Sequence, residues 1–131
     1  MRFTERELTL ALAGAAKDVL AVQDKSVRKG KKTVDQAWDE LGAFGRFQML
    51  DGLGGQVLPV LVALPDVDVE VGTRPTFTDE QVRECVESHL GELSGVRRKL
   101  TLEARVALIR SALAAVPPRQ DPDAFIVPDH I

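Results

Sequence analysis

The stretch Phe3-Thr4-Glu5-Arg6-Glu7-Leu8 decides the fold, because it opens a helix and recurs in altered form at residues 77–82. In both places a threonine is followed three residues later by Glu or Gln, which is the spacing of a capping box. The phenylalanine before each threonine and the Leu or Val that follows have the spacing of a hydrophobic staple. We therefore expect helices to begin after Thr4 and after Thr78.

The bulk composition is that of one soluble domain. A chain of 131 residues, 44% of them apolar and 28% charged, can bury a core without a disulfide. A net charge of -3 argues against a protein that coats nucleic acid with its whole surface. One cysteine excludes an internal disulfide and a multi-cysteine zinc site. Since no apolar run approaches the roughly 20 residues of a membrane span, we expect a cytoplasmic protein.

Apolar residues recur at intervals of three and four in four segments, which predicts four amphipathic helices. We expect these helices at residues 5–23, 34–50, 79–94 and 102–116. Gly42 and Gly45 are candidate positions for a bend in the second helix, and Thr101 is the expected cap of the fourth. Small residues in the first helix predict close packing on more than one side. The predicted fold is all-α, with four main helices in two helical hairpins.

The segment between the hairpins has two parts. Residues 56–64 are apolar on every side, so we expect them to be buried. Pro59 is tolerated in the first turn of a helix but not in a central strand, which favours a short helix there. Residues 66–77 begin with a strict alternation of acids and valines, the strand period. A hairpin of the two parts is one alternative, and an extended crossover between helix pairs is the one we prefer.

The C-terminal end of the chain lacks the helical periodicity of the preceding segments. Pro117 and Pro118 stop the last helix, which leaves a single helical domain at residues 1–118. Residues 119–131 are expected to form an extended or irregular tail. Within it, Phe125, Ile126 and Val127 lie between two prolines and form a candidate docking peptide for a protein partner.

Two clusters of basic residues beside predicted helix ends are the strongest polar signal. Their members are Lys25, Arg28, Lys29, Lys31, Lys32, Arg97, Arg98 and Lys99. If the hairpins lie side by side, both clusters and Arg105 would form one patch for the phosphates of a nucleic acid. Aromatic residues are not interleaved with them, and the connection before residue 101 is too long for a helix-turn-helix. Nucleic-acid binding is therefore the first alternative function.

Cys85 and His89 are four residues apart, which on a helix places them within reach of a shared ion. Zinc needs further ligands, for which the candidates are Glu84, Glu92 and His130. A thiol becomes nucleophilic in a partly exposed, electropositive site, whereas this helix is acidic. A metal or thiol site is thus the second alternative, and we expect a small buried thiol beside a core histidine, with no cofactor.

Several apolar side chains lie off the main stripes of their helices. They are Leu10, Leu20, Phe47, Leu50 and Leu108. Exposed apolar patches usually mark interfaces. No catalytic constellation accompanies them, and no motif of a known family allows a site residue to be carried over. The sequence therefore favours a small non-catalytic helical interaction or regulatory module, with a homodimer as the candidate assembly.

Overall fold

The computed structural model describes residues 1–120, and the regular structure of that range is entirely helical. The helices are α1 (Glu5–Gln23), α2 (Lys25–Arg28), α3 (Val34–Glu40), α4 (Gly42–Ala63), α5 (Asp79–Glu87) and α6 (Gly95–Ala114). The prediction of an all-α fold is confirmed. The candidate docking peptide Phe125-Ile126-Val127 and the candidate ligand His130 lie outside the described residues.

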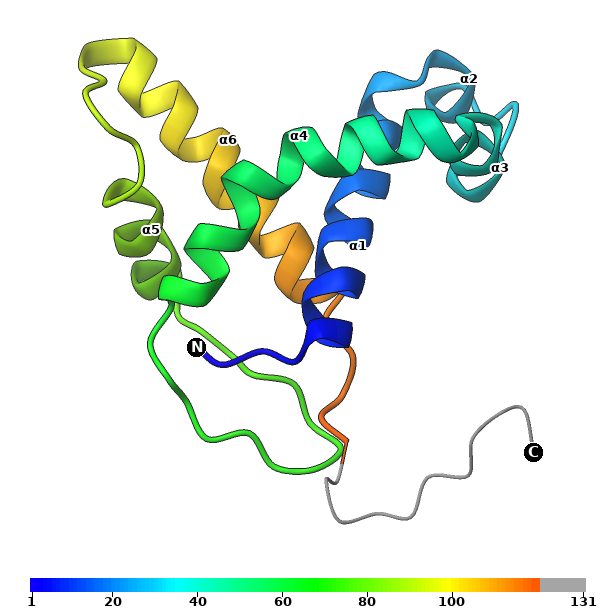
Figure 1. Ribbon diagram of the computed structural model, residues 1–131. Coiled ribbons are helices and arrows are strands. Elements are labelled where there is room, and N and C mark those ends of the chain that lie inside the picture. The colour runs from blue at the N-terminus through cyan, green and yellow to red at the C-terminus, as the bar shows by residue number, and fades with distance from the viewer. Residues whose placement is uncertain (121–131) are drawn as a thin grey trace.

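α1 and α6 form the two sides of a V, which meet where α1 begins and α6 ends (Figure 1). α4 crosses one side of this V and contacts both helices, while α5 packs against α6 and α4. α2 and α3 lie at the far end of α1. The first and last helices therefore contact each other directly, and α1 has partners on several sides, as its small residues predicted.

Three helices begin with the same cap. The Thr4 hydroxyl accepts a hydrogen bond from the Glu7 N–H (3.1 Å), and the Glu7 carboxylate accepts one from the Thr4 N–H (2.8 Å). The same pair of hydrogen bonds is complete at Thr33 and at Thr78. Each satisfies two backbone donors that a helix start leaves free. The predicted starts of α1, α3 and α5 are thus confirmed.

The helix predicted at residues 34–50 differs from the observed helices in extent. Gly42 has a φ of +71°, which suits glycine, and it separates α3 from α4. α4 then continues to Ala63, so the apolar segment at 56–64 is the end of a long helix. Val57, Val60, Leu61 and Leu64 of this segment are buried, but Pro59, Val62 and Ala63 are exposed, so the expectation that the whole segment is buried is wrong for one face of the helix. Pro59 lies inside α4, where its ring removes a hydrogen bond to the carbonyl of Gly55. Because Gly55 is exposed, water can bind that carbonyl instead.

The helices predicted at residues 79–94 and 102–116 are also shifted. α5 ends at Glu87, and Gly91, with a φ of +69°, turns the chain before α6. α6 begins at Gly95, so Thr101 lies inside the helix and does not cap it. The cations Arg97, Arg98 and Lys99 in the first turns of α6 oppose its dipole, which disfavours this start. The high helix propensity of Arg, Lys and Leu offsets this cost.

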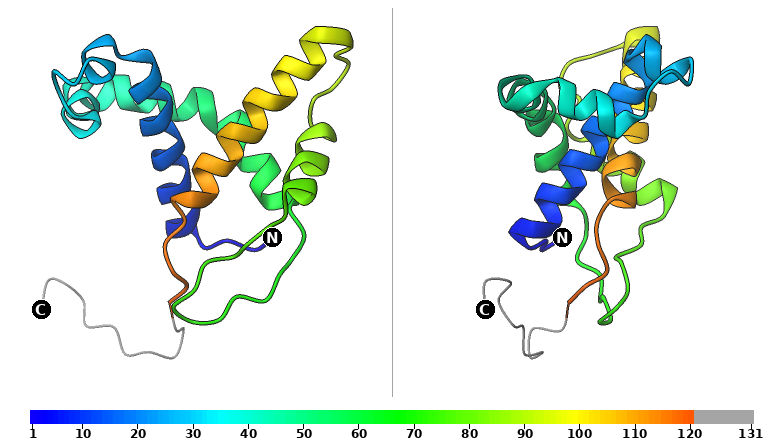
Figure 2. Two further views of the ribbon diagram at one scale, coloured as in Figure 1. Left: turned by 180° about the vertical axis from the view of Figure 1, so that it is seen from behind. Right: turned by 90° about the vertical axis from the view of Figure 1, so that its right-hand side faces the viewer.

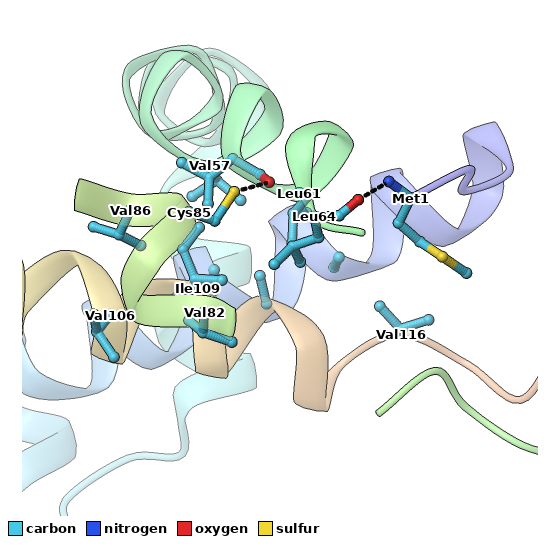
Figure 3. Close-up of a cluster of buried hydrophobic side chains, with 14 of the residues drawn as sticks. Met1, Val57, Leu61, Leu64, Val82, Cys85, Val86, Val106, Ile109 and Val116 are labelled. Carbon is cyan, nitrogen blue, oxygen red and sulfur yellow. Dashed lines mark hydrogen bonds between the residues drawn. The ribbon is translucent and has the colours of Figure 1, made fainter. Parts of the chain in front are cut away.

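The core lies where α1, α4, α5 and α6 meet (Figure 3). Its fully buried larger side chains are Leu61, Leu64, Ile109, Val57, Val60, Val82, Val86 and Val116. The chain between α4 and α5 is extended and forms no strand, which confirms a crossover rather than a hairpin. This crossover is fixed by Arg119, whose N–H donates to the Thr73 carbonyl (2.7 Å) and whose carbonyl accepts from the Gly72 N–H (2.8 Å).

Candidate functional site

An open groove of about 390 Å³ lies between α1 and α6, with the middle of α4 as its floor. Figure 2 shows this side of the V from behind, with α1 and α6 in front of α4. Its apolar lining residues are Val19, Val22, Leu53, Ala104, Ala107 and Leu108, and its polar ones are Asp18, Gln23, Gln56, Arg105 and Ser111. The apolar residues come from all three helices, so the groove is a product of the packing and not of one segment.

The groove exists because α1 and α6 diverge. Near the closed end, Ala11 and Ala15 of α1 are completely buried. About two turns beyond Ala15 on the same stripe, Val22 is 71% exposed, although its place in the helical period of α1 favours burial. The apolar stripe of α1 is therefore longer than the surface that covers it, and its uncovered end lines the groove.

A close contact at the closed end fixes this divergence. Gly14 of α1 faces Ala115 at the end of α6, and a Cβ atom added to Gly14 would overlap the Ala115 methyl group. Glycine thus allows the two helices to approach closely at one point. From that point they separate along the V, as Figure 1 shows.

The two walls of the groove carry different charges. Asp18 lines it on the α1 side and Arg105 on the α6 side, where Arg105 also donates to the carbonyl of His89 (3.3 Å). Arg97 is exposed two helical turns before Ala104 and so lies on the same face of α6. The α6 wall is therefore basic, while Asp18 makes the α1 wall acidic at one point.

The two basic clusters lie apart. The first includes α2 at the end of α1, and the second is the start of α6, on the other arm of the V (Figure 1). Each cluster has members with partners inside the chain. Lys32 pairs with Glu40 (2.5 Å) and Asp24 (3.6 Å), and the hydrogen bond from Glu40 raises the pKa of Lys32. Arg98 donates to the carbonyl of Leu93 (3.4 Å).

The remaining members of these clusters are exposed: Lys25, Arg28, Lys29 and Lys31 around α2, and Arg97 and Lys99 on α6. Their positions on different arms mean that each cluster presents its charge to solvent separately. A phosphate backbone would have to span both arms to contact all of them.

Cys85 and His89 point to different partners. The Cys85 thiol is buried and donates to the carbonyl of Val60 (3.3 Å), as Figure 3 shows, and its burial raises the pKa of the thiol. His89 lies beyond the end of α5 and is exposed, whereas the sequence placed it in the inward stripe. Its Nδ1 atom is 2.8 Å from the Cys85 carbonyl and 3.1 Å from the Ser88 hydroxyl.

No group of three or more His, Cys, Asp and Glu side chains within residues 1–120 is arranged to hold a metal ion. In the same range, every helix is too short or too polar to cross a lipid bilayer. Comparison of the chain with protein-family models, with curated proteins and with solved structures gave no match. Within residues 1–120, the groove is distinguished by a mainly apolar lining that comes from α1, α4 and α6.

Sequence reasoning identified part of the groove only. Leu108 was recognised as an apolar residue off the main stripe of its helix, and it lines the groove. The helical period of α1 favours burial of Val19 and Val22, because periodicity does not reveal where a covering helix diverges. Ala104 and Ala107 are a weak indication of the groove in the sequence, because small residues in the middle of α6 allow another helix to approach closely.

Proposed function

We propose that this protein is a helical interaction module that binds an amphipathic helix of a partner protein in the groove between α1 and α6. The observation that carries the proposal is the apolar lining of the groove, in which Val22 is 71% exposed on a stripe that is otherwise packed. Concave sites with a mainly apolar lining and a few polar groups at the edge are where proteins usually bind their ligands.

The shape of the groove supports a helix as its occupant. Within residues 1–120, α1, α4 and α6 are the three long helices, with 19, 22 and 20 residues, and the groove lies among them. A fourth helix placed there would complete a bundle, because packed helices approach to about 8–10 Å between their axes. Ala104 and Ala107 leave room for that approach. This is the helix-in-groove mode of recognition, with anchors at intervals of three and four residues.

The charges of the walls define the partner further. An occupant helix would present an apolar stripe to the floor and acidic side chains toward Arg105 and Arg97. A basic side chain would face Asp18. Charges at the rim of an interface influence orientation and association rate more than affinity. The partner is therefore expected to be an amphipathic helix that is acidic on one flank.

Selection from a library of displayed helical peptides tests this proposal. Peptides that bind the full chain are expected to have an apolar stripe with helical spacing and acids along one flank. Their binding should fall at least about tenfold on Val22→Glu or Ala107→Glu, because each places a charge in the apolar lining. Both residues are exposed, so neither substitution disturbs the core.

Val71→Glu is the matched control, since Val71 is a valine of the crossover that is 58% exposed and does not line the groove. It should leave peptide binding unchanged. Selected peptides without helical spacing, or peptides that bind Val22→Glu and Ala107→Glu as well as the unchanged chain, would show that the groove is not the binding site.

A further inference from the structure

The outward face of α4 is unusually apolar for an exposed helix surface. Phe44 is 71% exposed, Phe47 62% and Val62 57%. Arg46 and Asp51 are the charged residues of the 22-residue helix. Leu53 lines the groove, and Phe44 and Val62 are each nine residues or two and a half turns away from it, so they lie on the opposite face of α4. The groove and the outer face of α4 are therefore separate surfaces.

We propose that a second copy of this chain covers the outer face of α4, so that the two α4 helices pack antiparallel about a two-fold axis near Leu53. This inference goes beyond the groove, whose occupant is another protein. It rests on the residue order along α4, on two exposed glycines near its middle and on the size of the face.

The order of residues along this face is self-complementary. Phe44 and Val62 lie at equal separations on either side of Leu53, and so do Phe47 and Pro59. An antiparallel pair centred there places Phe44 of one copy against Val62 of the other, and Phe47 against Pro59, at both ends of the interface. A two-fold interface requires this kind of self-match, because the same surface is used by both copies.

The middle of the face allows close approach of two helices. Gly52 and Gly55 are exposed, and a Cβ atom added at either would meet no atom within 4 Å. Packing within residues 1–120 therefore does not require glycine at these positions, although glycine destabilises a helix interior. A second backbone lying across them explains why both side chains are absent.

The size of the face sets the expected strength of the dimer. α4 has 22 residues and is thus about 33 Å long. One face of such a helix gives an interface at or below the standard size of about 800 Å² per partner. The dimer should accordingly be weak and depend on concentration. The two Asp51 carboxylates flank the two-fold axis, and their repulsion weakens it further.

Sedimentation equilibrium of the full chain from roughly 1 µM to 1 mM, the concentrations at which a weak dimer forms, tests the association. The unchanged chain should pass from monomer to dimer over this range. Phe44→Glu and Val62→Glu should each weaken the dimer at least about tenfold. Asp51→Asn should tighten it about twofold, because exposed charges interact weakly. Val71→Glu, at a crossover valine of similar exposure, should have no effect.

Disulfide trapping tests the antiparallel orientation. In a Cys85→Ala background, a mixture of a Phe44→Cys chain and a Val62→Cys chain should form the mixed disulfide faster than either chain links to itself, because only the mixed pair is adjacent. A strict monomer at every concentration, a dimer unaffected by Phe44→Glu, or faster linking between like cysteines would overturn the proposal. Val22→Glu should leave the dimer intact, which separates this inference from the groove function.

Discussion

Arg119 and Glu7 form an ion pair that joins the segment after α6 to α1. The Nε atom of Arg119 is 3.0 Å from one carboxylate oxygen of Glu7, and its Nη2 atom is 3.2 Å from the other. Glu7 is only 3% exposed, and it also accepts the hydrogen bond of the Thr4 capping box. One carboxylate therefore caps α1 and holds the segment that follows α6.

The first prediction concerns this pair. Arg119→Ala should lower the free energy of unfolding by about 1–3 kcal/mol, because it leaves the buried Glu7 carboxylate with the Thr4 N–H as its remaining partner. Arg119→Lys should cost less, since it keeps the charge but loses the forked geometry. Urea denaturation followed by circular dichroism measures both.

The double variant Arg119→Ala/Glu7→Gln provides the control for that experiment. Removing the charge of Glu7 should recover part of the loss, because the neutral amide is less costly to leave buried. A loss in Arg119→Ala that stays the same with Gln at position 7 would mean that another side-chain contact of Arg119, its hydrogen bond to the carbonyl of Arg2 (3.4 Å), supplies its effect.

The second prediction compares the loss of stability on replacing each of three threonines by alanine. Thr4→Ala and Thr78→Ala should each destabilise the protein by about 1 kcal/mol, since each removes the acceptor of a capping box. Thr101→Ala should be neutral or slightly stabilising, because Thr101 lies inside α6 and Ala has the higher helix propensity. Thermal denaturation of the three variants tests the order, and a loss at Thr101 equal to that at Thr4 would contradict it.

These threonines also show which parts of the fold were accessible from the sequence. Thr4, Thr33 and Thr78 are each followed three residues later by Glu or Gln, whereas Thr101 is followed by Ala104. The complete capping boxes correctly predict where α1, α3 and α5 begin. Thr101, which has no Glu or Gln partner, predicts a helix start that the structure does not have. Capping is a local interaction of adjacent residues, which is why it can be read without the fold.

The groove could not be predicted in the same way. Val22 continues the helical period of Ala11 and Ala15. This periodicity does not show that α6 diverges from α1 and leaves Val22 exposed. The divergence depends on Gly14 and Ala115, which are far apart in the sequence and meet only in the folded chain. Likewise, the separation of the two basic clusters follows from the angle between α1 and α6.

The third prediction tests that contact. Gly14→Ala should destabilise the protein by about 1–3 kcal/mol, because the new methyl group overlaps the Ala115 side chain and forces the helices apart. This outcome is opposite in sign to the gain that Ala gives in an open helix interior. The double variant Gly14→Ala/Ala115→Gly should recover much of the stability, and an equal loss in single and double variants would exclude the contact as the cause.

The last prediction concerns the pH dependence of Cys85. Because burial raises the pKa of this thiol, the folded chain holds its proton to higher pH than the unfolded chain does. The corresponding stability is present below the ordinary thiol pKa and is lost as pH rises through the raised value. A disulfide exchange reagent should therefore react with the folded chain at least about tenfold more slowly than with the urea-unfolded chain at pH 8.

Ser88→Cys in a Cys85→Ala background is the control, because it places a thiol at an exposed position nearby that should react rapidly in the folded chain. Fast reaction of Cys85 itself at neutral pH would show that the thiol is accessible and would contradict its burial against Val60.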